Sequence, residues 1–157
     1  MIVETATLND VEEILALQKR AYLSEAEIYD DFTIPPLRQT LEEIKKDFEV
    51  QIFLKAVENG RIIGSVRAFL REGTCYVGRL IVHPEFQNQG IGKKLMGRVE
   101  EVFKAVPRFE IFTGHKSERN LHLYGKLGYR RFKTVTANEK LIIVFLEKYR
   151  IEETGDG

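Results

Sequence analysis

The sequence has very little cysteine, with Cys75 the single one among 157 residues. One thiol can form neither an internal disulfide nor a metal site with several thiolate ligands, and it fits a reducing compartment. An excess of charge is also missing, because Lys+Arg and Asp+Glu both total 24. No global electric field therefore points to a nucleic acid or a membrane surface, so partners must be predicted from local motifs.

Long apolar runs and targeting signals are absent too. No segment approaches the roughly 20 apolar residues that span a bilayer, and the N-terminus MIVETATLND lacks a basic region followed by an apolar core. We therefore expect a cytoplasmic protein, monomeric or homodimeric, that binds neither nucleic acid nor membrane. No repeat or linker divides the chain, so we expect one domain over residues 1–150 and a disordered tail over residues 151–157.

The first third of the chain predicts a strand followed by two helices. A short strand at residues 2–6 leads into a helix that we expect to begin at a capping box formed by Asn9 and Glu12. A second capping box, Thr40 with Glu43, begins a helix that runs to about residue 48. Between these helices, residues 24–39 read SEAEIYDDFTIPPLRQ, which we expect to be irregular because acid and proline dominate it.

The remainder predicts strands and two further helices. Turns at Asn59-Gly60 and Glu72-Gly73 separate three strands, and Pro84 ends the third one. Apolar residues at helical spacing follow from residue 91 until Pro107, and then come a strand at 109–112, a helix at 117–127 and strands at 131–135 and 141–146. The predicted order is βααβββαβαββ.

Residues 82–95 read VHPEFQNQGIGKKL and connect the strand that Pro84 ends to the next predicted helix. Two glycines lie where this helix begins, and we expect this helix start to bind an anion. The first turn of a helix has unpaired N–H groups and a partial positive charge, and Gly90 and Gly92 remove side chains that would obstruct an anion. A Walker A loop would need glycine at position 87 and Ser or Thr at 94, and a dinucleotide fingerprint would need glycine at 95. The sequence has glutamine, lysine and leucine at these positions, so both motifs are excluded.

What remains is the pattern Q-x-x-G-x-G between a strand and a long helix. It suits a pyrophosphate held by successive backbone amides. A glycine-rich helix start with solvated lysines is the alternative that this stretch alone leaves open.

A second motif, RNLHLYGKLGY at residues 119–129, favours the first interpretation. Asn120 and Tyr124 lie four residues apart, hence on one helical face, and Gly128 ends the helix. The strand LIVHP, the pattern Q-x-x-G-x-G and this motif together resemble the GNAT superfamily of acyl-CoA-dependent N-acyltransferases, specifically from residue 74 to residue 129. The resemblance implies a single-domain α/β (α+β) fold with a mixed, mostly antiparallel sheet, splayed strands and flanking helices.

The resemblance further implies an N-acetyltransferase that transfers an acetyl group from acetyl-CoA to a primary amine of a small molecule, peptide or protein, without a metal. In such enzymes the strand before the loop carries a bulge, and its freed backbone groups pair with pantetheine. Loop amides would hold the pyrophosphate, and lysines could meet the 3′-phosphate or simply be solvated. The implied coenzyme-binding residues are Leu80, Ile81, Val82, Gln87, Asn88, Gln89, Gly90, Ile91, Gly92, Lys93, Asn120, Tyr124 and Lys126.

One residue, Tyr124, receives a catalytic role from the resemblance, as the general acid that protonates the departing thiolate. Its alternative role is that of a half-buried packing residue. The base that deprotonates the amine stays unassigned, because the strand position where many members carry glutamate corresponds to Gly78 or a neighbour without a carboxylate. Glu110, His83 and His115 are the candidates.

The acceptor is expected to contact the variable segment at residues 24–39. There Tyr29, Asp30 and Asp31 place acid beside an aromatic ring, which would suit a cationic amine through charge pairing and cation–π contact. A solvated polar loop is the alternative. Two other functional classes also stay open, namely a non-catalytic acyl-CoA sensor and a structural interaction module.

Overall fold

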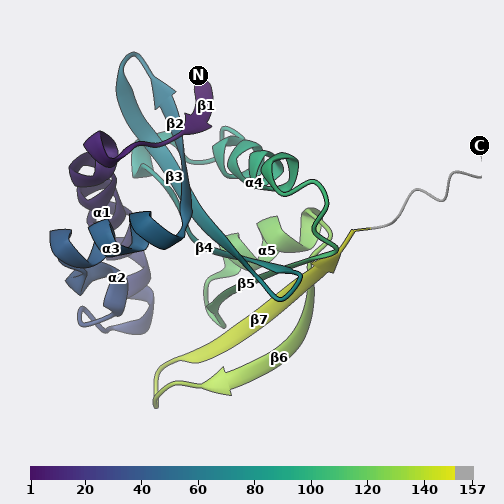
Figure 1. Ribbon diagram of the computed structural model, residues 1–157. Coiled ribbons are helices and arrows are strands. Elements are labelled where there is room, and N and C mark those ends of the chain that lie inside the picture. The colour runs from purple at the N-terminus through teal and green to yellow at the C-terminus, as the bar shows by residue number, and fades with distance from the viewer. Residues whose placement is uncertain (151–157) are drawn as a thin grey trace, which may run out of the picture.

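The computed structural model describes residues 1–150, and the tail predicted at residues 151–157 lies outside them. Seven strands form one sheet in the order β1-β2-β3-β4-β5-β7-β6, with α1, α2 and α3 on one side and α4 and α5 on the other (Figure 1). The elements are β1 (Ile2–Thr5), α1 (Val11–Tyr29), α2 (Pro35–Arg38), α3 (Leu41–Val50), β2 (Ile52–Glu58), β3 (Arg61–Arg71), β4 (Thr74–Val82), α4 (Ile91–Val102), β5 (Arg108–Gly114), α5 (Glu118–Lys126), β6 (Arg130–Thr136) and β7 (Ile142–Tyr149). The predicted fold class is confirmed, and α2 is an added single turn.

The strands β2, β3 and β4 form an antiparallel meander joined by the two predicted tight turns. Asn59 and Gly60 have φ angles of 51° and 75°, and Glu72 and Gly73 have 50° and 81°. Positive φ at both central residues is the backbone twist that a two-residue hairpin requires, and it explains Asn-Gly at the first turn. Both turns therefore form where the sequence predicts them.

The sheet opens between β4 and β5. These strands run parallel but pair only where Thr74, Cys75 and Tyr76 face Arg108, Phe109 and Glu110, and beyond that point no register joins them. On the other side of β4, Arg67 faces Gly78 whereas Ser65 faces Ile81, so β4 has one residue more than β3 across this interval. A bulge at Arg79, whose φ is 48°, accommodates the extra residue and bends the strand. The implied bulge and splay are thus present.

Three predicted boundaries are wrong. A single 3-10 turn (Leu8–Asp10) precedes α1, and its capping box consists of Thr7 and Asp10, not of Asn9 and Glu12. The acidic residues 24–29, expected to be irregular, continue α1 to Tyr29, because Glu, Ala and Ile are compatible with a helix and proline comes only at residue 35. Helix α4 ends at Val102, before the last apolar residues of its predicted periodicity. The Thr40–Glu43 capping box is confirmed, with bonds of 3.0 and 3.2 Å.

Two apolar clusters hold the helices on the sheet. One packs α4 against the sheet and includes Ile63, Leu95 and Phe109, and the other packs α1 and α3 and includes Ile14 and Phe53. Each of these side chains is at most 1% exposed. Full burial of one such side chain contributes roughly 1.5–3 kcal/mol, so both layers are firmly fixed around the opening between β4 and β5.

Candidate active site

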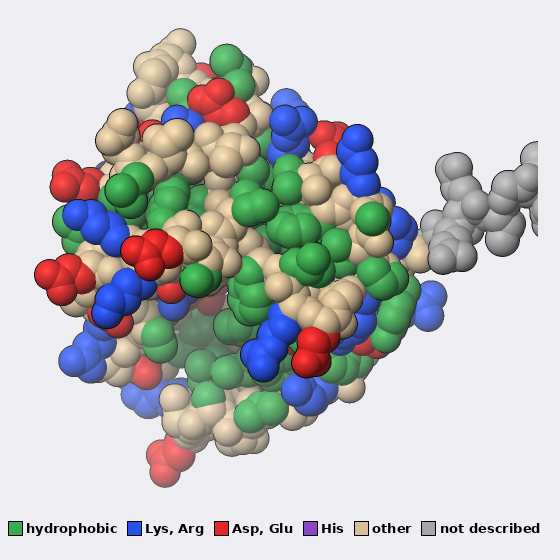
Figure 2. Space-filling view, viewed as in Figure 1, with side chains coloured by type: hydrophobic (Ala, Val, Ile, Leu, Met, Phe, Trp, Pro, Cys, Tyr) green, Lys and Arg blue, Asp and Glu red, His purple; other side chains and the backbone are tan. Residues whose placement is uncertain are grey.

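Two cavities meet where the sheet opens. The first, which we call the loop cavity, has a volume of about 920 Å³ and lies along the end of β4, the connection to α4 and one side of α5. The second, the splay cavity, has a volume of about 650 Å³ and lies between α1, α2 and the diverging strands β4 and β5. Figure 2 shows hydrophobic side chains gathered around a hollow on this face. Four residues line both cavities: Tyr22, Glu25, Leu80 and Asn120.

The floor of the loop cavity is made of backbone at the start of α4. Asn88 and Gly90, with φ angles of 63° and 79°, turn the chain into the helix. Among residues 1–150, no turn, loop or cap hydrogen bond is donated by a backbone N–H of residues 87–93. These N–H groups and the positive end of the helix dipole are therefore available to an anion.

The two glycines of this connection serve different purposes. Gly90 is needed for its positive φ, and a Cβ there would meet no atom within 4 Å. A Cβ at Gly92 would instead lie 3.1 Å from Leu123 and 3.6 Å from Leu80. Both leucines line the loop cavity, so Gly92 keeps the first turn of α4 close to its walls. A larger residue at this position would fill the cavity.

Most of the predicted coenzyme-binding residues line the loop cavity. Of the thirteen, Gln89 lines neither cavity, and Tyr124 lines the splay cavity instead. The structure thus brings together the end of β4, the loop and the face of α5 that carries Asn120. The individual binding roles stay predictions.

Tyr124 lies deep in the splay cavity. Its side chain is 2% exposed, and no side-chain hydrogen bond of its hydroxyl is found within residues 1–150. Burial raises the pKa of this phenol, so it keeps its proton at neutral pH. One turn earlier, Asn120 donates an amide hydrogen bond to Thr113 Oγ1 at 3.2 Å, which fixes this face of α5. The arrangement leaves a protonated hydroxyl free to donate.

Glu25 is the carboxylate at the junction of the cavities. Ser117 Oγ donates a hydrogen bond of 2.6 Å to its Oε2. Ser117 has only one hydroxyl proton, so in the 2.8 Å bond between Tyr29 and Ser117 the Tyr29 hydroxyl donates to Ser117 Oγ. The Tyr29 oxygen in turn accepts from the Lys116 N–H at 2.9 Å. Such a chain of bonds is mutually polarising and orients the carboxylate of Glu25.

Sequence reasoning placed Glu25 in the acidic segment but did not assign it to the transfer site. The sequence signal that could have identified Glu25 is the spacing of Tyr22, Glu25 and Tyr29, which share one face of a helix. That face exists only because α1 continues through residues 24–29, which we had expected to be irregular.

The three bases that the sequence offered as candidates are placed less well than Glu25. His83 is 3% exposed and lines neither cavity; its Nδ1 accepts from the Glu85 N–H, and its Nε2 lies 2.8 Å from Arg61. Burial lowers its pKa, with Arg61 adding to the effect. His115 also lines neither cavity. Glu110 does line the splay cavity, but its carboxylate lies 2.9 Å from Arg108.

The predicted acceptor residues are separated. Tyr29 lines the splay cavity, whereas Asp30 and Asp31 line neither cavity. Asp31 accepts bonds from the backbone N–H and hydroxyl of Thr33, and Asp30 follows the C-terminus of α1. Contact of these aspartates with an amine stays a prediction, and Glu25 is the acid of residues 24–39 that lines the cavities.

Two further observations describe residues 1–150. They contain no group of three or more His, Cys, Asp or Glu side chains placed to hold a metal ion. None of their helices is both long enough and apolar enough to cross a membrane.

Comparison with known proteins identifies similar chains. A profile described as the acetyltransferase (GNAT) family matches residues 10–129. The UPF0157 protein YqkA of Bacillus subtilis (strain 168) is 29% identical over 137 residues, or 87% of this chain, and the chain spans 39% of that protein's length.

Solved structures share the fold. The PaiA N-acetyltransferase of Thermoplasma acidophilum, solved in complex with coenzyme A, aligns with a TM-score of 0.72 and 18% identity over 96% of this chain and 100% of its own. The yncA protein of Salmonella typhimurium, solved with its cofactor acetyl-CoA, aligns with a TM-score of 0.74 and 19% identity over 100% of this chain and 98% of its own.

Proposed function

Because the chain belongs to the acetyltransferase (GNAT) family, whose members are acyltransferases, we propose that it transfers the acetyl group of acetyl-CoA to a primary amine. The observation that carries the proposal is the junction of the two cavities. The loop cavity offers backbone N–H groups to an anionic coenzyme, and the splay cavity offers a carboxylate to the acceptor amine and a phenol to the leaving thiolate. An amine and a thioester would meet at the four residues that line both.

The coenzyme would lie in the loop cavity. Backbone N–H groups of residues 87–93 would bind the pyrophosphate, and the freed strand at Leu80, Ile81 and Val82 would pair with pantetheine. An amide near Ile81 would polarise the thioester carbonyl as negative charge develops on its oxygen. Lys93 and Lys126 line the same cavity and would contribute positive charge near the phosphates. The relatives solved with coenzyme A and acetyl-CoA support this assignment.

The acceptor reaches the thioester as a free amine. An alkylammonium group has a pKa of about 8–10.4, so a proton must leave before the nitrogen attacks the thioester carbonyl. Glu25 would accept this proton, since it lies at the junction and only the Ser117 hydroxyl bonds to it within residues 1–150. The amine nitrogen then forms the C–N bond, and a tetrahedral intermediate results.

Collapse of the intermediate breaks the C–S bond. Tyr124 would transfer its hydroxyl proton to the departing thiolate. The second proton of the attacking nitrogen would leave through solvent as the amide forms and would restore the Tyr124 hydroxyl, while Glu25 returns its own proton to solvent. Because burial makes this phenol a weaker acid, the proton would move as charge develops on sulfur rather than beforehand. The products are an N-acetylated amine and coenzyme A with a free thiol.

A thermal-shift titration followed by a thiol-release screen tests the proposal. Acetyl-CoA at a hundredfold excess over its Kd should stabilise the fold by about 2.7 kcal/mol. At least one primary amine should then release free coenzyme A. Stabilisation without thiol release across the amine panel would favour the sensor function, and no stabilisation would reject coenzyme binding altogether.

Replacing the proposed base refines the test. Glu25→Gln keeps the size of the side chain but cannot accept the proton, so kcat should fall by about 10²-fold, the lower end for a lost general base. Glu12→Gln is the matched control, because Glu12 is an exposed glutamate of the same helix. Equal turnover in the two variants at saturating substrates would exclude Glu25 as the base.

A further inference from the structure

The charges that line the splay cavity do not all cancel. Two of its three acids are paired: Asp47 lies 2.7 Å from Arg67, and Glu110 lies 2.9 Å from Arg108. The lining charges without an oppositely charged partner within 4 Å, among residues 1–150, are Glu25 and Arg79. One carboxylate and one guanidinium therefore line the same cavity, and neither forms a salt bridge with a described residue.

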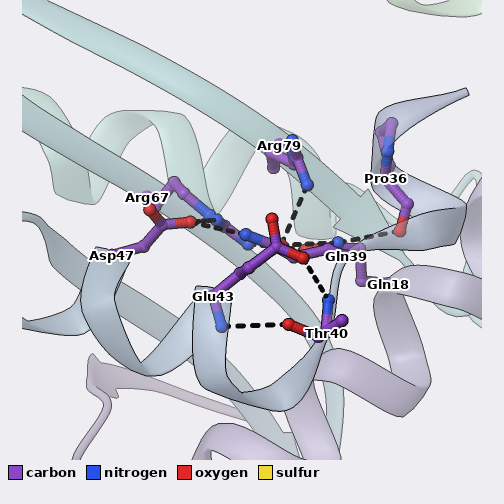
Figure 3. Close-up of polar contacts among 8 residues, drawn as sticks. All are labelled: Gln18, Pro36, Gln39, Thr40, Glu43, Asp47, Arg67 and Arg79. Atoms are coloured by element: carbon purple, nitrogen blue, oxygen red, sulfur yellow. Dashed lines mark hydrogen bonds and ion pairs between the residues drawn. The ribbon is translucent and has the colours of Figure 1, made fainter.

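The bulge in β4 places Arg79 in this cavity. The residue has a φ of 48°, a left-handed conformation that is uncommon for a side chain of this size. Its Nη1 donates one hydrogen bond of 3.0 Å to Gln39 Oε1, and Figure 3 shows the two side chains meeting. A guanidinium has five N–H donors in a planar fork, and no other bond within residues 1–150 uses those of Arg79.

A buried polar network holds the partner of Arg79 in place. Gln39 donates to Asp47 Oδ2 at 2.7 Å and accepts at 3.0 Å from Gln18, which is fully buried. Arg67 donates to both Asp47 and Gln18, at 2.7 and 2.5 Å (Figure 3). Its guanidinium also lies over the ring of Phe53.

Arg67 and Arg79 contact the same network but differ in how deeply their side chains are buried. Burial lowers the pKa of Arg67 to about 10, with the positive charge of Arg79 adding to the effect, and the carboxylate of Asp47 opposes it. Arg67 is thus a 5% exposed structural cation that is bound to the carboxylate of Asp47 and to Gln18. Arg79, by contrast, is only partly buried and keeps donors for a ligand.

Another acid on which the charge of Arg79 acts is Glu43, whose carboxylate accepts the Thr40 backbone N–H at 3.0 Å in the capping box of α3. That hydrogen bond lowers the pKa of Glu43, and its carboxylate lies beyond 4 Å from Arg79. Glu43 therefore serves the helix start and leaves Arg79 without a direct carboxylate partner.

Resting on the proposed acetyl transfer, we infer that the acceptor is a small aminocarboxylate, in its simplest form an amino acid, whose carboxylate binds Arg79 and whose amine lies at Glu25. Arginine is well suited to this role because its fork can bind a carboxylate through two parallel hydrogen bonds. The acceptor nitrogen would then lie at the junction with the loop cavity, where the thioester arrives.

The walls of the splay cavity indicate the side chain of this acceptor. They include Phe69 and Tyr76, stacked with ring centroids 5.3 Å apart, and Phe112 and Phe145, at 5.7 Å. Tyr22 lines the same cavity, and burial raises the pKa of its phenol, with the charges of Arg79 and Glu25 acting on it in opposite directions. An apolar side chain would contact these rings, whereas a polyamine would place a second cation against Arg79.

Paired amines test this inference. The probes are amino acids with apolar side chains and their carboxamides, which lack the negative charge and carry a less basic amine, so kcat/KM is compared for the deprotonated amine. Binding of each to the protein saturated with coenzyme A is measured by thermal shift, and thiol release from acetyl-CoA is measured separately. The acids should be preferred by at least about tenfold in Kd and in kcat/KM, about 1.4 kcal/mol.

Two variants complete the experiment. Arg79→Gln should abolish the preference for the acid, and Arg71→Gln, an exposed arginine at the end of β3, should keep it. Carboxamides that bind as well as acids, a preference that survives Arg79→Gln, or no binding of any acid would each overturn the inference. Thiol release with neutral amines or polyamines in those cases would leave the proposed acetyl transfer standing, so the two failures are distinguishable.

Discussion

The two cavities at the centre of this protein are built in different ways. The loop cavity is lined by one continuous segment, from the end of β4 through the start of α4, together with residues of α1 and of α5 and the turn before it, and its anion-binding groups are backbone N–H groups. The splay cavity collects side chains from α1, α2, the sheet and α5, and its polar groups are carboxylates, guanidiniums and phenols.

This difference separates the binding of the coenzyme from the selection of the acceptor. Backbone N–H groups at a helix start can bind a pyrophosphate without a dedicated charged side chain, so the anion site of the loop cavity depends mainly on its glycines and on chain direction. Side chains from several elements can be exchanged independently, so the splay cavity can select one acceptor. Changes in the first should affect the coenzyme alone, and changes in the second should affect the acceptor and the chemistry.

The largest expected effect is on turnover, from Tyr124→Phe in the splay cavity. The ring is kept and one hydroxyl is lost, so acetyl-CoA affinity should persist while kcat falls by about 10²–10⁴-fold, the range for a lost general acid. The measurement is steady-state kcat at saturating amine, with a coenzyme titration beside it.

Tyr129→Phe is the matched control for this prediction. Its ring lies 6.1 Å from that of Tyr124, and its buried hydroxyl has no hydrogen-bond partner within residues 1–150. This variant should keep turnover. Full activity in Tyr124→Phe would show that the tyrosine is a packing residue.

Gly92→Glu should give the next largest effect, confined to the coenzyme. A side chain at this position would enter the loop cavity between Leu123 and Leu80, and its carboxylate would repel the pyrophosphate. We expect Kd for acetyl-CoA to rise by about 100-fold, or about 2.7 kcal/mol. Calorimetric titration measures it.

Gly97→Glu controls for the charge and for the loss of a glycine from α4. A Cβ at Gly97 would meet no atom within 4 Å, and the residue lines neither cavity. If the two variants bind acetyl-CoA equally well, the loop cavity is not the coenzyme site.

Gly114→Ala should disturb the acceptor side moderately. A Cβ there would overlap the hydroxyl end of Tyr29, whose hydroxyl begins the chain of bonds to Glu25. Displacement of this ring should destabilise the fold by about 1–3 kcal/mol, as overpacking does, and raise KM for the amine. Chemical denaturation and steady-state kinetics would test it; an unchanged KM would show that Tyr29 does not position Glu25.

The smallest effect should come from pH. His83 accepts the Glu85 N–H just before the loop, and its pKa lies below the ordinary value of about 6.5. A lowered pKa means that the unfolded chain binds the proton more readily, so this contribution to stability is present above about pH 6.5 and is lost as pH falls through the folded pKa.

Protonation of His83 would break the hydrogen bond that its Nδ1 accepts from the Glu85 N–H. Because the order of residues 87–93 would then decrease, the affinity for acetyl-CoA should decline modestly at acidic pH. His83→Gln should flatten this part of the profile. A decline of equal size in the variant would assign the pH dependence to other groups.

The sequence was sufficient for the loop cavity because its signals are local. Gly90 at a positive φ, Pro84 after a strand and the spacing of Asn120 and Tyr124 each depend on neighbours in the chain. The two hairpin turns and the Thr40 capping box were predictable for the same reason. The prediction for Asn9 failed because one 3-10 turn moved the cap to Thr7.

The splay cavity could not be predicted in the same way. Arg79 faces it only because β4 bulges, and its partner Gln39 lies 40 residues earlier in the chain. Glu25 is joined to Ser117 across 92 residues. These contacts depend on how α1 and α2 pack against the open sheet, which no local pattern specifies.

Residue-resolved NMR of the acetyl-CoA complex tests the division between the cavities most directly. The account predicts that backbone amide resonances of residues 87–93 shift strongly on coenzyme binding, as N–H groups without partners acquire an anion. The side-chain resonances of Arg79 and Phe69 should change little until an acceptor is added. Strong shifts at Arg79 and Phe69 with acetyl-CoA alone, and unchanged amides at residues 87–93, would contradict it.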